Sequence, residues 1–362
     1  MVKEIVFHLG DCKTGTTSIQ SVLASGAWKT PTGILGGDIT YPTRFNHMNL
    51  AKTLSVEAKK PFEEKHFSKL RKAFDTSDAT YGVISAEHFE FVDPALVKSA
   101  IERHLPEYVD RMRFVAYVRP HADRLVSTFA ERTKKGLFYK SLTAMHDKLA
   151  LKGTLFYTPR FEKWRALFGD NFTLRPFVRD RLYHADVVHD FFYYLFDSDE
   201  FEITQPTEAN ESLSVEDIAM LRAIHRHLRK NPNIARLQQQ NFGWYMSDFL
   251  TSTPGRGDTR PRLHEALAQQ VVDVYRADAR DLDASFFDDN QMEEALSMAK
   301  EKSVAEEQSF KAVDHYHPMQ MRHFKVWAQM LMRLMLADPD HFSWAMRPPE
   351  LRGPNPSKSK IS

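Results

Sequence analysis

A lysine among hydroxyl residues, Lys13-Thr14-Gly15-Thr16-Thr17-Ser18, follows a short apolar run near the start of the chain. Backbone N–H groups in a glycine-containing turn converge on one concavity, and the start of a following helix adds the positive end of its dipole. Lys13 adds a mobile positive charge and the hydroxyl groups add donors. The sequence therefore predicts a phosphate-binding turn between a strand and a helix. Because Thr and Ser also favour helix starts without any ligand, simple helix capping is the alternative interpretation.

This turn departs from the common nucleotide-hydrolase pattern G-x-x-x-x-G-K-[ST]. Cys12, rather than a glycine, precedes Lys13, and Gly15 follows the lysine. The departure weakens an interpretation as an ordinary ATPase loop. The sequence predicts an anionic ligand here, but a differently built phosphate site.

A second candidate site lies where the apolar run 112–118 ends in Arg119 and Pro120, before a helix-like segment that carries Ser127. Proline suits the entry to a helix. A guanidinium group can bind two oxygens of one phosphate while a hydroxyl group donates a third bond, so Arg119 and Ser127 can converge on a phosphate. Pairing of Arg119 with a carboxylate and exposure of Ser127 to solvent are the alternatives.

Residues 8–20 resemble the 5′-phosphosulfate loop of sulfotransferases that use 3′-phosphoadenosine-5′-phosphosulfate (PAPS), especially bacterial members. Arg119 and Ser127 keep the spacing of the 3′-phosphate site in that family. The resemblance spans about the first 215 residues. It implies a P-loop-like α/β fold, with a central parallel sheet flanked by helices and a C-terminal helical extension. The PAPS-binding residues that it implies are Lys13, Thr14, Gly15, Thr16, Thr17, Ser18, Arg119 and Ser127.

The apolar run 81–86 leads directly into Glu87 and His88. Glycan-directed and bacterial sulfotransferases carry a glutamate at the corresponding strand end, often in a Ser-x-Glu context, so the resemblance implies that Glu87 is the catalytic base. His88 is the reserve candidate. Neighbours on a strand point to opposite faces, so we expect only one of the two to reach the acceptor. A surface carboxylate and a packing histidine are the alternatives.

Two further roles follow from the same resemblance. His47 stands where related bacterial sequences often carry a histidine, which implies a place in the acceptor pocket; a loop histidine without a ligand is the alternative. Lys13 is expected near the oxygen that bridges sulfate and phosphate, where it stabilises the negative charge that grows as the bond breaks. This scheme requires no metal ion, unlike that of kinases.

The predicted function is transfer of a sulfuryl group from PAPS to a hydroxyl group of a small molecule or glycan, with a carbohydrate or glycolipid as the expected acceptor. The product of the donor is adenosine 3′,5′-bisphosphate (PAP). Two alternatives stay open: a P-loop phosphotransferase with magnesium on Thr14, and a non-catalytic sensor of PAP or PAPS. The sequence predicts neither the acceptor nor the oligomeric state.

Composition narrows the class of protein further. The 362 residues include 49 lysines and arginines against 48 aspartates and glutamates, so no bulk attraction to nucleic acid is expected. Cys12 is the only cysteine, which excludes an internal disulfide and fits a reducing compartment. No apolar stretch approaches the roughly 20 residues of a membrane span. An early core strand leaves no room for a cleavable leader, so we expect a cytoplasmic protein.

Strand and helix patterns alternate along the first part of the chain, which predicts a parallel sheet. The expected strands are 4–9, 81–86, 112–118 and 171–177, and the expected helices are 16–25, 62–75, 94–104, 121–135 and 186–196. Helices at 214–230, 261–281, 291–308 and 318–337 should follow, and segments 30–60 and 136–160 should be irregular. The predicted division is an α/β core over 1–215, a mainly helical part packed on it over 216–345, and a disordered tail over 346–362.

Overall fold

The computed structural model describes residues 1–205, 212–255, 257–347 and 352–356. Its contacts form two compact units. The first, called the sheet unit here, comprises Met1–His121, Leu155–Ala209 and Tyr275–Ser297; the second, called the helical unit, comprises Ala122–Thr154, Asn210–Val274 and Met298–Ser362. These units interleave along the chain, whereas the expected division was linear, and the division into functional domains stays a prediction. A disordered tail was predicted over 346–362. Of that segment, residues 348–351 and 357–362 lie outside the described residues.

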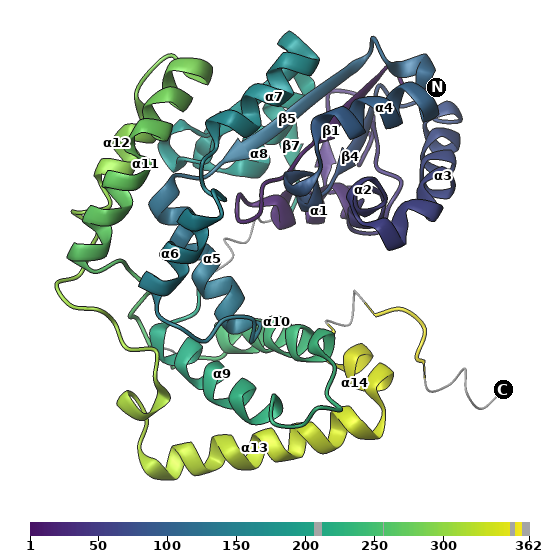
Figure 1. Ribbon diagram of the computed structural model, residues 1–362. Helices are drawn as coiled ribbons and strands as arrows, with labels where there is room; N and C mark the ends of the chain where they lie inside the picture. Colours follow the sequence, from purple (N-terminus) through teal and green to yellow (C-terminus); the bar gives the residue numbers. More distant parts are fainter. Residues whose placement is uncertain (206–211, 256, 348–351, 357–362) are drawn as a thin grey trace. The chain divides into compact units, whose positions relative to one another are not determined.

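A five-stranded parallel sheet forms the centre of the sheet unit, in the order β3-β4-β1-β5-β6. Its strands are β1 (Glu4–His8), β3 (Ile39–Thr40), β4 (Tyr81–Ser85), β5 (Met112–Val118) and β6 (Phe172–Pro176). Figure 1 shows β4 and β5 on either side of β1. The predicted P-loop-like α/β fold with a central parallel sheet is therefore confirmed. In open parallel sheets, ligands bind at the carboxyl ends of the strands, where the connections that leave two neighbouring strands run to opposite sides of the sheet. Here that point is the carboxyl end of β1.

One face of the sheet packs against α1 (Thr16–Ser25) and α8 (Val187–Phe196). Val6, Val83 and Val115 of the three central strands are fully buried in this layer. Alternate residues of a strand point to opposite faces, so the neighbours of these valines supply the other layer. The phosphate-loop candidate is thus followed by a helix whose apolar face is buried on the sheet.

The opposite face is built largely from aromatic rings. Phe7 stacks on Phe114 with centroids 5.0 Å apart. Phe114 also contacts Trp164 and Phe168 of α7 (Thr158–Phe168), with centroids 5.9 and 4.0 Å away. Aromatic pairs at such distances add to the stabilisation from area burial alone. Helices therefore cover both faces of the sheet, and both ends of the phosphate loop are anchored in packed structure.

Other helices of the first part of the chain are α2 (Met48–Ser55), α3 (Glu63–Asp75), α4 (Pro94–His104), α5 (His121–Lys134) and α6 (Leu142–Leu151). A small antiparallel sheet pairs β2 (Trp28–Lys29) with β7 (Glu202–Ile203). The helices from residue 215 onward are α9 (Val215–Leu228), α10 (Arg236–Ser252), α11 (Glu265–Phe286), α12 (Gln291–Ser297), α13 (Pro318–Ala337) and α14 (Pro339–Ala345). No helix in the described ranges combines the length and apolarity that crossing a bilayer requires.

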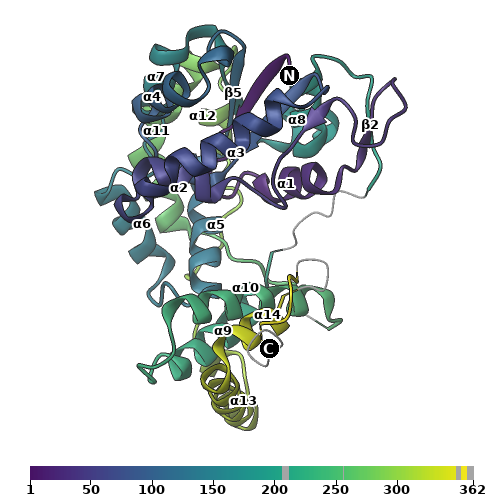
Figure 2. The same ribbon diagram turned by 90° about the vertical axis from the view of Figure 1, so that its right-hand side faces the viewer.

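In the helical unit, α13 packs along α9, and Figure 2 views α13 nearly end-on beside it. Phe324 and Met335 of α13 are buried, whereas Met319 and Met330 are 51% and 54% exposed. Only part of the methionine-rich helix α13 is therefore buried in the core of the helical unit. The remainder forms an exposed apolar side of the helix.

Two predicted helix boundaries are wrong for a shared reason. The helix expected over 291–308 ends at Ser297, and the helix expected from 261 begins at Glu265. The two segments that were expected to be helical instead pair with each other through their backbones. The Val304 N–H donates to the Leu263 carbonyl at 2.9 Å, and the Glu265 N–H donates to the Val304 carbonyl at 3.0 Å. A tertiary pairing of this kind overrides local helix propensity.

Five helices in the described part of the chain were not predicted: α2, α6, α7, α10 and α14. α6 and part of α7 lie in the segment 136–160, and α2 lies in 30–60, both of which were expected to be irregular. α10 carries Gly243 and several glutamines, which blur its apolar periodicity. Tertiary packing, rather than a strong amphipathic pattern, stabilises α6, α7 and α10.

A buried carboxylate joins β5, β6 and α8 in the sheet unit. Asp190 is fully buried and accepts a hydrogen bond from the Tyr117 hydroxyl at 2.7 Å. Arg175 binds both oxygens of the Asp190 carboxylate, at 2.6 and 2.7 Å, and the Tyr183 backbone N–H donates to it at 2.9 Å. Because every side of this charge is paired, its burial is compatible with a stable fold.

Asp190→Asn should lower the free energy of unfolding by about 3 kcal/mol, because it leaves the partly buried Arg175 guanidinium without its counter-charge. Asp289→Asn is the matched control: its carboxylate pairs with Arg181 at 2.8 Å with both side chains 42% exposed, and exposed pairs contribute little. Urea denaturation of both variants measures the difference. Equal small effects would show that the Asp190 network does not hold the layers together.

Candidate functional site

The loop between β1 and α1 has an unusual backbone. Gly10, Lys13 and Gly15 all have positive φ angles, of 35°, 70° and 74°. A lysine rarely adopts this conformation, which costs a non-glycine residue of the order of 1–3 kcal/mol and occurs preferentially at functional sites. The loop therefore turns sharply before α1 begins at Thr16.

The start of α1 lacks a capping side chain. Gly15 occupies the N-cap position and offers no side-chain acceptor. By contrast, Asp93 caps α4 and Asp186 caps α8 in the same unit. Among the residues that the structure describes, the backbone N–H groups of Thr16 and Thr17 have no hydrogen-bond acceptor. These donors, at the positive end of the helix dipole, are suited to an external anion.

The hydroxyl groups of the loop divide into two pairs. Thr14 and Thr16 are buried, and their hydroxyls donate to the Asp11 backbone carbonyl at 2.6 and 3.4 Å. A hydroxyl group has one hydrogen to donate. These two predicted binding residues therefore hold the loop together in this structure, whereas Thr17 is exposed and Ser18 is partly exposed.

Asp11 anchors the loop through its side chain as well. Its carboxylate is only 2% exposed and binds both terminal nitrogens of Arg160, at 2.6 and 2.5 Å. The Arg160 guanidinium lies over the Phe161 ring, 4.2 Å from its centroid. Sequence reasoning missed this pair because Arg160 lies 149 residues after Asp11, on α7, a helix that was not predicted.

Glu90, also missed from the sequence, connects the loop to the turn that follows β4. The backbone N–H of Cys12 donates to Glu90 Oε2 at 2.9 Å. Glu90 belongs to the 3-10 helix Glu87–Phe91, whose first residue is the predicted base. The contact places this turn directly against the candidate phosphate loop. Glu87 itself is partly exposed.

The expectation about Glu87 and His88 rested on a strand geometry that is absent at those positions. β4 ends at Ser85, and both residues belong to the 3-10 helix, so strand alternation does not decide which one faces an acceptor. His88 Nε2 is hydrogen-bonded to Ser55 Oγ of α2 at 2.9 Å. Burial, with a smaller effect from the charge of Lys52, lowers the pKa of His88.

Arg119 directly contacts the candidate phosphate loop. Its Nη1 donates to the Lys13 backbone carbonyl at 3.0 Å, and its guanidinium lies over Phe177, 5.6 Å from the ring centroid. Phe177 lies close to Gly15 as well. The two predicted basic residues are thus brought together. Ser127 lies on α5 within the helical unit, and its pairing with Arg119 stays a prediction.

A buried polar cluster lies at the carboxyl ends of β1 and β4. Ser85 Oγ lies 2.9 Å from His8 Nδ1 and accepts a hydrogen bond from Gln20 Nε2 at 3.0 Å. Asn46 Nδ2 donates to Gln20 Oε1 at 3.4 Å. The sequence offered no signal for the cluster, because each partner comes from a different element.

His47 completes this cluster with a defined protonation state. The Ser85 backbone N–H donates to His47 Nδ1 at 3.2 Å, so Nδ1 accepts and the proton of the neutral ring is on Nε2. His47 is 7% exposed, and its Nε2 is buried without a hydrogen-bond partner among the described residues. Burial lowers the pKa of His47 to about 3. His47 can therefore donate a hydrogen bond but is poorly suited to accept a proton.

The sheet unit thus gathers Lys13, Arg119 and the turn carrying Glu87 around the uncapped start of α1. Two positive side chains and unpaired backbone donors form an arrangement that can hold a phosphate or sulfate group. Among the described residues, no group of three or more His, Cys, Asp or Glu side chains is placed to hold a metal ion.

Gly15→Ala tests how tightly the loop is built. A Cβ at Gly15 would lie 2.5 Å from Val187 Cγ1, in addition to the strain of its positive φ. Gly33→Ala is the matched control, since Gly33 has a φ of 72° but open space around its Cα. We expect Gly15→Ala to lower the free energy of unfolding by about 1–3 kcal/mol more than the control does, as overpacking does elsewhere. Equal losses in urea denaturation would contradict the described packing.

The buried histidines should make stability depend on pH. Burial lowers the pKa of His8 and of His47 to about 3, against about 6.5 in an unfolded chain. Between these values the unfolded state binds more protons, so the free energy of unfolding falls as the pH is lowered. Each histidine should contribute a loss of about 2 kcal/mol from pH 7.5 to pH 5.

His47→Gln should reduce this pH-dependent loss by about 2 kcal/mol in urea denaturation at the two pH values. The matched control is His323→Gln, on the exposed side of α13, which should leave the loss as it is in the wild type. An unchanged pH dependence in the His47 variant would show that the imidazole is not held neutral by burial.

No family model matches the sequence, and no curated protein matches it. Among solved structures, the chain is similar to one described as the crystal structure of a sulfotransferase from Alicyclobacillus acidocaldarius. That similarity has a TM-score of 0.42 and 13% sequence identity, and it covers 81% of this chain and 99% of the other. At this TM-score and identity, the similarity alone assigns no function to this chain.

Proposed function

We propose that this protein is a sulfotransferase that moves the sulfuryl group of PAPS to a hydroxyl group of a carbohydrate or glycolipid. The observation that carries the proposal is the start of α1, where the N–H groups of Thr16 and Thr17 lack acceptors. Lys13 precedes them, and Arg119 contacts the same loop. Positive charge and unpaired donors at one helix start favour a dianionic ligand.

The residues present fit the two ends of this donor. The backbone donors of Thr16 and Thr17, together with the Lys13 ammonium group, match the charge of a 5′-phosphosulfate. Arg119 suits the 3′-phosphate because its planar guanidinium group can bind two oxygens, and Ser127 is the proposed third donor. PAPS supplies the activated sulfuryl group, and the protein orients it.

The proposed reaction is a direct in-line displacement. The acceptor oxygen forms a bond to sulfur while the bond from sulfur to the bridging phosphate oxygen breaks, and PAP leaves. Glu87 takes the hydroxyl proton as general base. Lys13 stabilises the charge that develops on the departing phosphate oxygen, a contribution that typically amounts to a hundred- to a thousand-fold in rate.

Glu87 is the best of the three candidate bases on chemical grounds. His47 carries its proton on Nε2 and has a pKa lowered to about 3, so it would act as a hydrogen-bond donor to the acceptor. His88 uses Nε2 in a hydrogen bond to Ser55. Glu87 begins the turn that touches the loop through Glu90. A carboxylate in that position can receive a proton without disrupting the polar cluster.

One observation argues against the phosphotransferase alternative. In that mechanism the residue after the loop lysine binds magnesium through its hydroxyl group. Here Thr14 is fully buried, and its hydroxyl donates to the Asp11 carbonyl inside the loop at 2.6 Å. Binding magnesium would require this part of the loop to rearrange. A cytoplasmic location stays a prediction.

Turnover measurements on two variants test the proposal. Lys13→Ala should slow sulfate transfer from PAPS by a hundred- to a thousand-fold. Glu87→Gln should slow it by a hundred- to ten-thousand-fold while PAP affinity stays within a few-fold of wild type, because the base does not hold the donor. Glu57→Gln, which removes an 86% exposed carboxylate from a different 3-10 helix (Glu57–Phe62), is the matched control and should leave both quantities unchanged.

The same preparations separate the alternatives. PAP should bind without magnesium and at least tenfold more tightly than 5′-AMP, since Arg119 recognises the 3′-phosphate. Tighter binding of ATP with magnesium than of PAP would favour the phosphotransferase. Binding of PAP with no transfer to any sugar of an acceptor library would favour the sensor. Full turnover by Glu87→Gln would remove Glu87 as the base.

A further inference from the structure

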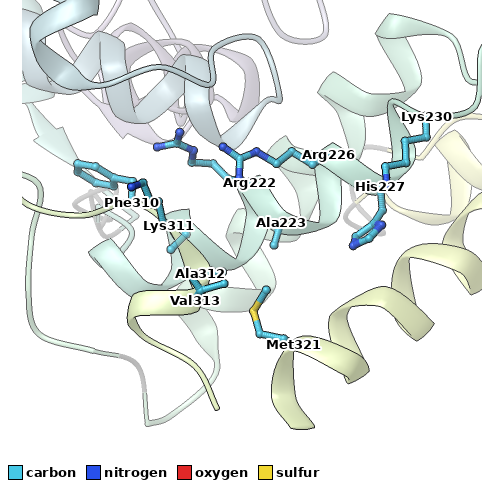
Figure 3. Close-up of a pocket in the computed structure, with 11 residues that line it drawn as sticks. Arg222, Ala223, Arg226, His227, Lys230, Phe310, Lys311, Ala312, Val313 and Met321 are labelled. Carbon is cyan, nitrogen blue, oxygen red and sulfur yellow. The ribbon is translucent and has the colours of Figure 1, made fainter. Parts of the chain in front are cut away.

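The helical unit carries a stripe of positive charge on α9. Arg222 and Arg226 are spaced four residues apart and lie on one face of the helix, and Lys230 follows in the turn just after its last residue, Leu228. Figure 3 shows the guanidinium groups of Arg222 and Arg226 near each other on one side of α9. Like charges at this spacing repel and destabilise a helix. Such a stripe therefore calls for a compensating interaction.

A cavity of about 310 Å³ opens along this stripe, between α9, residues 310–313 and α13. Its walls carry Phe310, Val313 and Met321 together with alanines of α9. Lys311 and His227 join the α9 cations on its lining, and no carboxylate lines it. The volume lies within the range of small-ligand pockets. Apolar walls with a few charged groups are the usual lining of such pockets, and the charged groups here are all cations.

A second cavity, of about 370 Å³, shares Arg226 and Lys230 with the first and adds Arg229 and Tyr139. The Arg229 guanidinium lies over the Tyr139 ring, 5.3 Å from its centroid. The Tyr139 hydroxyl is buried without a hydrogen-bond partner among the described residues. An unpaired hydroxyl donor therefore belongs to a residue that lines the second cavity together with three cations.

Arg222 is the most informative residue of the first cavity. It is only 6% exposed, and its side chain donates to the Tyr139 backbone carbonyl. Its Nε is buried and has no partner among the described residues. Burial, together with the charge of Arg226, lowers the pKa of Arg222 to about 10. A buried cation without a counter-charge is unfavourable, and an anion in the cavity would relieve that cost.

Helix electrostatics account for only part of this arrangement. Cations in the last turn of a helix interact favourably with the negative end of its dipole, which explains Arg226, Arg229 and Lys230 near the end of α9. Arg222 lies more than one turn before the end, and the dipole effect is confined to the last turn. Its burial beside another arginine is left unexplained by the helix alone.

We propose that the α9 cavity binds an amphipathic anion, an alkyl or aryl group that carries a sulfate, sulfonate or carboxylate. The apolar body would occupy the space lined by Phe310, Val313 and Met321. The anionic head would lie between Arg226 and Lys230, which both cavities share, next to Arg229 and Tyr139 of the second cavity. All residues of this site belong to the helical unit, so the inference does not rest on the phosphate loop or on the proposed sulfate transfer.

Calorimetry with octyl sulfate, below its micelle concentration, tests the site in the full-length protein. Arg226→Gln/Lys230→Gln should bind octyl sulfate at least tenfold more weakly than wild type. The matched control is Arg236→Gln/Arg333→Gln, which removes the same charge from two exposed positions in the same unit and should bind as wild type does. Octyl glucoside and inorganic sulfate should each bind at least tenfold more weakly than octyl sulfate, because each lacks one half of the recognised chemistry.

Arg222→Met provides a second readout that a purely structural arginine would not give. The variant should raise the urea midpoint of the protein without ligand, since an apolar side chain of similar length replaces an uncompensated buried charge, and it should weaken octyl sulfate binding. A lowered midpoint with unchanged binding would assign Arg222 to structure alone. Wild-type affinity in the Arg226/Lys230 variant, or equal affinity for octyl glucoside, would overturn the proposal.

Discussion

The backbone conformation of residues 10–15 is the constraint on which the candidate site depends. Three positive φ angles, one of them at Lys13, turn the chain so that α1 starts without a capping side chain. This conformation is costly for a lysine and persists because its surroundings hold it. Asp11 is fixed by Arg160, and Cys12 is fixed by Glu90. The unpaired donors of α1 are therefore a consequence of contacts made by helices and turns far away in the sequence.

The sheet and the order of its motifs could be predicted from the sequence, because apolar strands and amphipathic helices alternate with clear boundaries. Arg119 was placed correctly at a strand end and Lys13 in the loop between a strand and a helix, and the structure joins them through one hydrogen bond. The inner role of Thr14 could not be predicted, since a threonine in a loop shows no preference between ligand and backbone. Glu90 and Arg160 were missed because their partners lie 78 and 149 residues away. Pairing over such separations leaves no local pattern.

The histidines show a second limit of sequence reasoning. His47 was expected to line an acceptor pocket, and the structure places it in a buried cluster where Ser85 fixes its tautomer. The position of the proton on the His47 ring depends on one backbone N–H group, that of Ser85, and a backbone group cannot be identified from the type of the residue that carries it. The helical unit illustrates the same point, because the charge spacing on α9 is visible in the sequence but the burial of Arg222 is not. In both cases burial decides whether a polar residue is structural or functional.

The most direct test of the central claim is a crystal structure of the protein with PAP bound. The account predicts that the 5′-phosphate lies within hydrogen-bond distance of the Thr16 and Thr17 backbone N–H groups, with the Lys13 side chain turned toward it and Arg119 on the 3′-phosphate. A nucleotide bound elsewhere, or a phosphate that makes no contact with the start of α1, would contradict it.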